Sequence, residues 1–356
     1  MAPFEHPFLG ELLGDPETAA LLSAETELAL MLRFEAELAA AQAAHGLVPS
    51  EAAAAIAELC TSFSPDLASL RASTARDGVV VPELVRQLRE ALGVPHARWI
   101  HLGCTSQDVI DTCLALRLDR TIKLLDERLA TLVAKLDELA RSRGDRRLMG
   151  RTRMRRAKPI LWSHKLASWR EPLVRHRRRL AELRPRLLRL QLGGATGDRA
   201  ELGPQAQAIA DRLADALGLG RADRAWHAER DGIAELAGWL AAVAGSLGKL
   251  GQDVALLAQD EVGELVVLRG GGSSAMPHKV NPVAAETLVA LARHAATLAP
   301  ALQHALVHEN ERSGAAWTLE WLALPPLLMT TGAATRTALR LIGELDLSED
   351  RLGEAG

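Results

Sequence analysis

The sequence predicts an all-α protein in which a long central helix bundle follows an N-terminal helical domain. Large apolar residues recur at alternating steps of three and four over long stretches, which places them on one face of an α-helix. Alternation of β-branched residues, which is typical of strands, is confined to short pieces at 79–81 and 265–268. Clusters of glycine and proline separate the apolar stretches and predict loops between long helices.

The N-terminal domain is expected over residues 1–110, where the amphipathic stretches are shorter than those that follow. The central bundle is expected over residues 111–345, and residues 346–356 are expected to form a tail.

Three apolar series predict the central helices. The first, over 114–139, alternates steps of four and three throughout, as the seam of a coiled coil does. The second, over 236–257, would be roughly 30 Å long at 1.5 Å per residue. The third, over 288–306, contains Pro300, which should kink or split the helix, and a further helix is expected at 162–192. Stripes this long and narrow need several partners to cover them, so self-association is expected.

The composition is that of an ordinary soluble protein. Apolar residues make up 48% of the 356 residues and charged residues 24%, close to globular averages. The formal net charge of -3 gives no overall attraction to nucleic acid or to an anionic membrane, so neither is an expected partner. No run of about 18 uncharged apolar residues suggests a membrane span.

The cysteines and the N-terminal stretch both favour a cytoplasmic protein. Cys60, Cys104 and Cys113 show neither C-x-x-C spacing nor a Cys/His cluster, which argues against a disulfide framework and against a metal site. The N-terminal stretch lacks the basic start and apolar core of a signal peptide.

Residues 269–282, RGGGSSAMPHKVNP, interrupt the apolar pattern. Three glycines open backbone geometries closed to other residues, which suits either a flexible surface loop or a loop whose amides approach a ligand. A linker has no need of Lys279 or Asn281, whereas an anion site does. Pro282 is well placed to open the next helix, whose N-terminus would add to the attraction for an anion.

The stretch GSSAMPHKVNP within this loop closely resembles the signature of the fumarase/aspartase superfamily. The resemblance implies that Ser273, the first serine of the pair, is the catalytic residue and lies on a mobile loop. It also implies that Lys279 and Asn281 hold a substrate carboxylate and stabilise an enolate-like dianion. This chemistry requires no cofactor and no metal.

Two further segments resemble the same superfamily, and the similarity spans most of the chain. In IHLGCTSQDVIDT, residues 100–112, the resemblance implies that Thr105 and Ser106 bind a substrate carboxylate, although hydroxyls at a helix start also serve as N-caps. QLGGATG, residues 191–197, matches a glycine segment of the family.

The segment GRTRMRRAKP, residues 150–159, departs from the superfamily pattern. Most members have Thr-His where this chain has Thr152-Arg153, and arginine stays charged and exchanges no proton near neutral pH. Thr152, Arg153 and Glu286 are expected in the substrate site, with Arg153 either paired to Glu286 or gripping substrate directly. Four histidines are candidates for the vacant role, although a lone histidine is more often structural: His101, His164, His227 and His278.

Nine of the eighteen residues at 141–158 are arginine or lysine, in a chain that is slightly acidic overall. A solvated helix end and loop would account for them, and so would a grip for a substrate with several carboxylates. RNA binding is the weaker alternative, because the chain has no tyrosine and the cluster has no interleaved aromatic residues.

WHAERD, residues 226–231, and ENERSGAAWTLEW, residues 309–321, resemble the branch of the superfamily that cycloisomerises 3-carboxy-cis,cis-muconate to a carboxymuconolactone. On this resemblance Arg230 and Arg312 are expected to bind substrate, while the tryptophans either line the site or fill the bundle. The expected substrate is a small polycarboxylate.

The resemblance also implies a homotetramer with active sites shared among subunits. The family's small C-terminal helical domain is expected to be absent, because the chain stops about where that domain would begin. A C–N lyase of the same fold, similar to adenylosuccinate lyase, and a non-catalytic helical oligomer are the alternatives.

Overall fold

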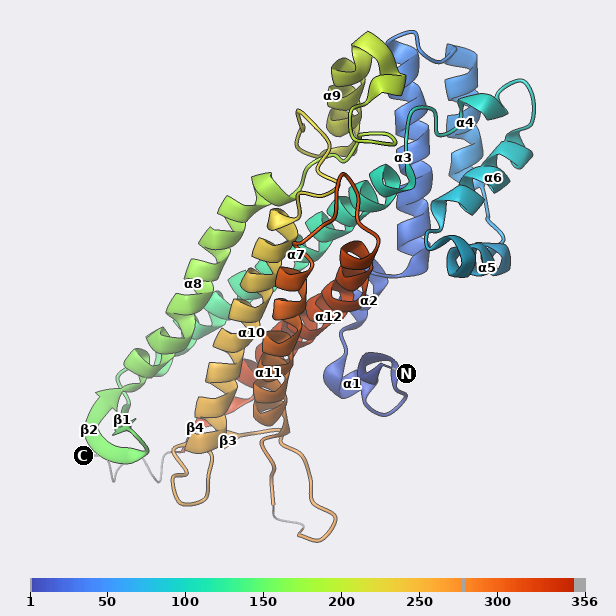
Figure 1. Cartoon of the computed structure of the whole chain (residues 1–356). Coiled ribbons are helices and arrows are strands. Elements are labelled where there is room, and N and C mark those ends of the chain that lie inside the picture. Colours follow the sequence, from blue (N-terminus) through green and yellow to red (C-terminus); the bar gives the residue numbers. More distant parts are fainter. Residues whose placement is uncertain (1, 277–278, 349–356) are drawn as a thin grey trace.

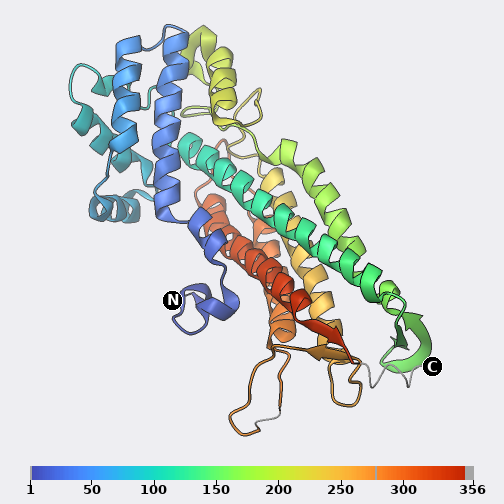
Figure 2. The same cartoon turned by 180° about the vertical axis from the view of Figure 1, so that it is seen from behind.

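The computed structural model describes residues 2–276 and 279–348 and shows an elongated helical molecule (Figure 1, Figure 2). Long helices run side by side along the molecule and form the central bundle, around one continuous apolar core. The bundle helices are α7 (Ser106–Arg143), α8 (Trp162–Leu187), α10 (Asp231–Leu257), α11 (Val283–His304) and α12 (Ala315–Gly343).

A smaller helical unit forms the upper end of the molecule in Figure 1. The elements before the bundle are η1 (Pro3–Glu5), α1 (Gly10–Leu13), α2 (Pro16–Leu21), α3 (Ala24–Ala44), α4 (Ser50–Ser62), α5 (Leu67–Asp77), α6 (Val81–Leu92) and η2 (Ala97–Trp99). The chain returns to this end with η3 (Ala200–Gln205) and α9 (Ala206–Leu217), and α9 packs against α3. The expected boundary at residue 110 lies inside α7, which already begins at Ser106.

The prediction of an all-α fold needs one correction, because the described residues also form two small antiparallel sheets. β1 (Arg147–Thr152) pairs with β2 (Arg155–Leu161), and β3 (Leu265–Val267) pairs with β4 (Leu345–Leu347). β3 matches the piece predicted at 265–268, whereas α6 begins within the piece at 79–81. β4 extends the central unit beyond residue 345, and the rest of the expected tail from 349 lies outside the described residues. The expected absence of a further helical domain stays a prediction.

The first two predicted apolar series are confirmed as buried seams. In α7, six residues of the seam are each at most 1% exposed: Leu118, Ile122, Leu125, Leu129, Leu132 and Leu136. In α10 the same holds for Leu236, Leu240, Val243, Leu247, Leu250 and Val254. α11 continues through Pro300 to His304 and is not split, because it packs along α10 and α12.

Among the described residues, one helix, α10, is long and apolar enough to cross a bilayer by length and composition. Its apolar window is 61% buried inside the bundle, where it packs against α8, α11 and α12. We interpret α10 as the core helix of the bundle.

His176 on α8 is a buried histidine inside this bundle. Its Nε2 lies 2.8 Å from Ser246 Oγ, and Arg179 Nη1 lies 3.3 Å from its Nδ1. An arginine only donates, so Nδ1 accepts and the proton of the neutral ring sits on Nε2. Burial, with added repulsion from Arg179 and Arg175, lowers the pKa of His176 to about 4.

We expect His176→Gln to make the protein less sensitive to acid. The unfolded chain takes up a proton at His176 near pH 6.5, whereas the folded chain resists it down to about 4. Stability is therefore lost as the pH falls between these values, by about 3 kcal/mol from this residue. Urea unfolding at pH 7 and pH 4.5 tests this, and His304→Gln, which changes an exposed histidine on α11, should leave the pH dependence unaltered.

Candidate active site

The residues expected to form the active site lie at opposite ends of the central bundle (Figure 1). We call the first group the upper cluster: Thr105, Ser106 and Arg312. We call the second group the lower cluster: Thr152, Arg153, Ser273, Lys279, Asn281 and Glu286. The 38 residues of α7 separate the two groups by about 57 Å at 1.5 Å per residue.

The upper cluster surrounds the start of α7. Arg312 Nη1 donates to Thr105 Oγ1 at 2.6 Å and to the carbonyl of Ala195 at 3.3 Å. Thr105 is the N-cap of the helix and Ser106 its first residue, and both are half-buried. The guanidinium of Arg312 and the hydroxyl of Thr105 therefore meet at the N-terminus of α7, and a cation beside a helix N-terminus suits a carboxylate.

The buried side chain of Asp108 connects the segments around the start of α7, although the sequence motifs did not single it out. Its fully buried carboxylate accepts the amides of Gly193 and Gly194 at 2.8 and 2.9 Å and the amide of Thr105 at 3.0 Å. His227 Nε2 lies 2.8 Å from Asp108 Oδ1. Asp108 thus ties the helix start, the predicted glycine segment and the WHAERD segment into one unit.

We expect Asp108→Asn to lower the free energy of unfolding by about 2 kcal/mol, because an amide group would face backbone donors that it cannot satisfy. The Michaelis constant for substrate should also rise, since the helix start would lose its support. Asp119→Asn is the matched control, because the one side-chain interaction of Asp119 within the described residues is a part-exposed pair with Arg184. Denaturant unfolding of both variants decides this, and equal losses would contradict a special role for Asp108.

Arg230 was expected to bind substrate, but its position does not fit that role. Its side chain is 1% exposed and lies between two buried carboxylates. It donates to Asp111 Oδ2 at 2.7 Å and to Glu320 Oε1 at 2.8 Å, with further bonds to the other oxygens of both groups. The guanidinium carbon of Arg230 also lies 5.0 Å from the centroid of the Trp226 ring. We assign Arg230 to the internal framework of the upper end, because substrate would have to break this network to reach it.

The signature loop of the lower cluster is closed at its base. The backbones of Gly271 and Asn281 exchange two hydrogen bonds of 2.8 Å. A Cβ on Gly270 would lie 2.2 Å from Val280 and 2.7 Å from the Asn281 carbonyl, so glycine is required for this close approach. Pro282 is the N-cap of α11, one residue before the helix begins, and so lies close to the first-turn position predicted for it.

Ser273 lies within this closed loop. Its Oγ accepts the amides of Met276 at 3.1 Å and Ala275 at 3.3 Å. Asn281 Nδ2 donates to the carbonyl of Gly272 at 3.3 Å, and Lys279 is exposed. The loop therefore presents a half-buried hydroxyl, polarised by two amides, together with a carboxamide and an exposed ammonium group.

Thr152 and Arg153 lie at the tip of the β1–β2 hairpin. Thr152 pairs with Arg155, and the two residues between them, Arg153 and Met154, both have positive φ, 49° and 63°. This is the geometry of a two-residue primed turn, here built without glycine or asparagine. Within the described part of one chain, no ion pair joins Arg153 to Glu286, which is exposed on the first turn of α11.

Of the candidate histidines that the structure describes, His101 and His227 lie away from the lower cluster. His101 Nδ1 lies 2.6 Å from Glu35 Oε1; burial lowers its pKa, but the Glu35 carboxylate outweighs this and the net pKa is raised. His227 binds Asp108 at the upper end, and His164 is exposed near the start of α8. His278 lies outside the described residues. The proton-transfer role vacated at Arg153 therefore stays unassigned among them.

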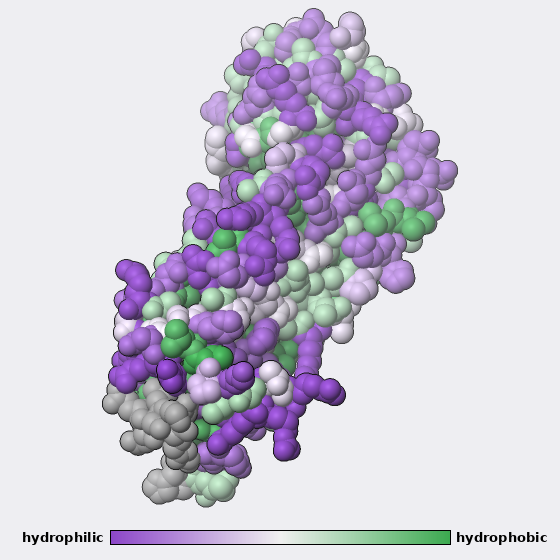
Figure 3. Space-filling view, turned by 90° about the vertical axis from the view of Figure 1, so that its left-hand side faces the viewer, coloured by the Kyte–Doolittle hydropathy of each residue, from purple (hydrophilic) through white to green (hydrophobic). Residues whose placement is uncertain are grey.

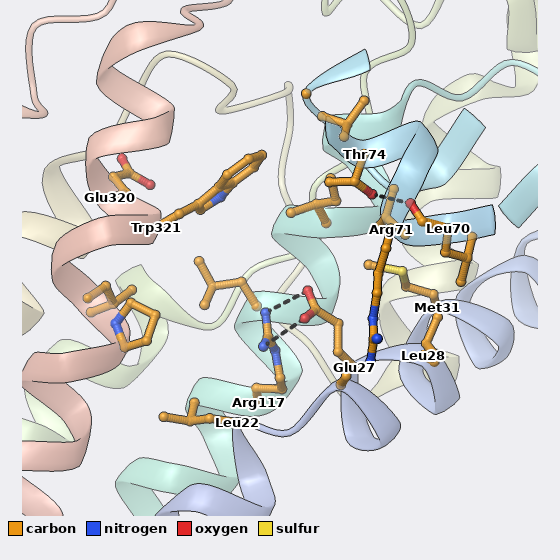
Figure 4. A pocket seen from close by; sticks show the side chains of 18 of the residues that line it. Leu22, Glu27, Leu28, Met31, Leu70, Arg71, Thr74, Arg117, Glu320 and Trp321 are labelled. Carbon is orange, nitrogen blue, oxygen red and sulfur yellow. Dashed lines mark hydrogen bonds and ion pairs between the residues drawn. The ribbon is translucent and has the colours of Figure 1, made fainter. Parts of the chain in front are cut away.

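A separate cavity of about 690 Å³ lies between α3, α5, α7 and α12 (Figure 4). Its lining is mainly apolar and includes Met31 and Trp321. Of its lining residues only Arg71 and Arg117 are cationic, and Arg117 Nη2 is already paired with Glu27 Oε1 at 3.0 Å. Because a polycarboxylate needs several free cations, we do not place the substrate here.

Comparison with known proteins supports the resemblance drawn from the sequence motifs. A lyase family matches residues 17–296. The 3-carboxy-cis,cis-muconate cycloisomerase of Pseudomonas aeruginosa is 42% identical over 339 residues, which cover 94% of this chain and 74% of that protein. The protein of the same name from Pseudomonas putida is 39% identical over 343 residues, covering 95% of this chain and 81% of that protein.

A solved structure supports the same family assignment. The crystal structure of 3-carboxy-cis,cis-muconate lactonizing enzyme from Pseudomonas putida matches with a TM-score of 0.91 at 39% identity. The match covers 98% of this chain and 78% of that one. The resemblance drawn from the motifs is confirmed: the chain belongs to this lyase family, within the fumarase/aspartase superfamily.

Proposed function

We propose that the chain is a 3-carboxy-cis,cis-muconate cycloisomerase, which interconverts this tricarboxylate and a carboxymuconolactone. The observation that carries the proposal is the sequence similarity of this chain to two proteins of that name, which extends over 94% and 95% of its length. Fold alone would not identify the substrate, because one fold hosts several chemistries. The site adds exposed cations and polarised hydroxyls, which suit a small polyanion.

The reaction is an isomerisation within one molecule. In the lactonising direction, a carboxylate oxygen of the substrate forms a C–O bond to a carbon of its own double bond. The π electrons move to the carbon α to another carboxylate and spread into it as an aci-carboxylate. A proton then adds to that carbon. The protein must hold the attacking carboxylate over the double bond and stabilise the charge that develops.

Ser273 is the proton donor in this proposal, and it removes the proton in the reverse direction. The amides of Ala275 and Met276 that donate to its Oγ would stabilise the negative charge left on the oxygen. Lys279 and Asn281 would bind the carboxylate that takes up the charge. The upper cluster, with Thr152 and Arg153, would hold the remaining carboxylates.

One chain cannot supply all of these groups, because about 57 Å of α7 separates the upper and lower clusters. The proposal therefore includes an oligomer in which a neighbouring copy brings its lower cluster to the upper cluster of the first. In such an assembly Arg153 of one copy would reach either substrate or Glu286 of another. We infer a homotetramer acting in the cytoplasm.

The bundle surface supports close packing between copies. Exposed positions on α10 and α11 carry small side chains at Gly238, Ala242, Gly245, Ala290 and Ala296. Pale surface, which is neither strongly hydrophilic nor strongly hydrophobic, lies across the middle of the molecule between strongly hydrophilic regions (Figure 3). Small side chains let helices of different chains approach closely, which suits a multi-chain bundle.

Mixing two inactive variants tests the shared site. Ser273→Ala damages only the lower cluster and Arg312→Leu only the upper one. Hybrid oligomers contain sites with an intact upper cluster from one variant and an intact lower cluster from the other. We expect activity to return when the two variants are unfolded and refolded together, but not when each is refolded alone. No recovery in mixtures that do form hybrids would show that each site is built from one chain.

The direct test of function is incubation with 3-carboxy-cis,cis-muconate while the diene absorbance is followed. Loss of absorbance with formation of the lactone supports the proposal. Turnover of adenylosuccinate instead would identify a C–N lyase. Failure to bind a tricarboxylate or turn over either compound would identify a non-catalytic helical oligomer.

A further inference from the structure

The β1–β2 hairpin has two distinct faces. Residues that pair directly across an antiparallel ladder project their side chains to the same side. The register pairs Arg151 with Arg156 and Thr152 with Arg155, so these two pairs lie on opposite faces. Arg155 is therefore the nearest cross-strand neighbour of Thr152.

The Arg151–Arg156 face is turned toward the bundle. Arg151 binds Glu264 through two hydrogen bonds of 2.9 and 3.0 Å, and Glu264 is only 5% exposed. This bidentate pair fixes the orientation of the hairpin. The Thr152–Arg155 face then points away from the bundle, and both of its residues are exposed.

Arg155 and Arg156 are closely matched in every other respect. Both are exposed, and neither makes an ion pair or a side-chain hydrogen bond within residues 2–276 and 279–348. They lie on opposite faces of the hairpin. The turn that joins their strands is also strained, because Arg153 and Met154 both adopt left-handed backbone conformations. Such strain is found where function requires a particular geometry.

We propose that Arg155 is a specificity-determining residue that binds the carboxylate distinguishing a tricarboxylate from a dicarboxylate. The inference rests on the proposed function and assigns one substrate group to one side chain. Of the three carboxylates, one attacks the double bond and one takes up the developing charge. The third does not react, so a bidentate guanidinium clamp holds the molecule there without slowing the chemistry. Arg155, beside Thr152, supplies this clamp.

Two saturated analogues isolate the third carboxylate. Propane-1,2,3-tricarboxylate and glutarate share the same five-carbon dicarboxylate skeleton and differ by the carboxylate on the central carbon. Calorimetric titration of the intact oligomer measures the dissociation constant of each. We expect Arg155→Gln to weaken binding of the tricarboxylate roughly 10- to 100-fold. Glutarate binding should change by less than about twofold.

Arg156→Gln is the matched control, and it should leave both dissociation constants within about twofold of the wild-type values. Arg155→Lys keeps the charge but loses the fork and should give an intermediate loss for the tricarboxylate. An equal loss for both analogues in Arg155→Gln, an equal loss in Arg156→Gln, or no tricarboxylate preference in the wild type would overturn the proposal.

The titration separates this inference from the proposed function. Binding of the saturated analogues is measured without turnover. A wild type that prefers the tricarboxylate through Arg155 but does not lactonise 3-carboxy-cis,cis-muconate supports the clamp and contradicts the proposed reaction. A wild type that lactonises, with discrimination unchanged in Arg155→Gln, contradicts the clamp alone.

Discussion

Replacement of Ser273 by alanine is expected to abolish detectable turnover of 3-carboxy-cis,cis-muconate while leaving the protein folded. The hydroxyl contacts only the amides of Ala275 and Met276 among the described residues, so its loss removes no packing from the bundle. It does remove the group that donates the proton. Loss of a positioned acid corresponds to a rate about a thousandfold lower. Diene absorbance measures turnover, and thermal unfolding measures the integrity of the fold.

Ser274→Ala provides the matched control for this experiment. Ser274 is the adjacent hydroxyl, is exposed, and makes no side-chain hydrogen bond within the described part of the chain. We expect its replacement to leave turnover near the wild-type rate. Near wild-type turnover in Ser273→Ala would remove the catalytic assignment. An equal loss in both variants would point to the loop conformation and not to the Ser273 hydroxyl.

Local sequence patterns predicted the parts of the fold that depend on local properties. The steps of three and four over 114–139 and 236–257 correspond to buried seams of α7 and α10, because helix periodicity alone determines which residues face the core. The glycine loop was predicted for a similar reason. Gly270 and Gly271 permit the close approach to Asn281 that closes the loop, and few other residues could.

Buried polar partners were not predictable from one sequence in the same way. Asp108 and Asp111 lie three positions apart, about one helical turn, at the start of the predicted helix, and this spacing was the available signal. Their partners, however, lie about 80 to 120 positions away, at Gly193, His227 and Arg230. Without those contacts a family arginine resembles a substrate ligand, and the role expected for Arg230 in substrate binding stays a prediction beside the buried pairs that it forms here.

The β1–β2 hairpin escaped prediction for a different reason. Its sequence is dominated by arginine, so it shows none of the apolar alternation by which strands are recognised. Arg153 and Met154 occupy turn positions that usually hold glycine or asparagine. The hairpin depends instead on tertiary anchoring, above all the Arg151–Glu264 pair.

Arg230→Met is expected to lower the free energy of unfolding by about 4 kcal/mol. Burial alone would lower the pKa of Arg230, but the Asp111 and Glu320 carboxylates raise it above the usual value, so the side chain stays charged. Methionine fills much of the same volume and leaves those two buried carboxylates without the guanidinium that neutralises them. An uncompensated buried charge costs more than the pair itself contributes.

Two further variants show whether the cost arises from the unpaired carboxylates. Adding Asp111→Asn and Glu320→Gln to Arg230→Met removes the buried charges and should recover much of the lost stability. Arg186→Met removes a comparable arginine whose pair with Glu235 is exposed, and it should cost less than about 1 kcal/mol. If urea unfolding gave similar small losses for Arg230→Met and Arg186→Met, the buried network would not hold the upper end together. Arg230 would then be free to bind substrate, as the sequence first suggested.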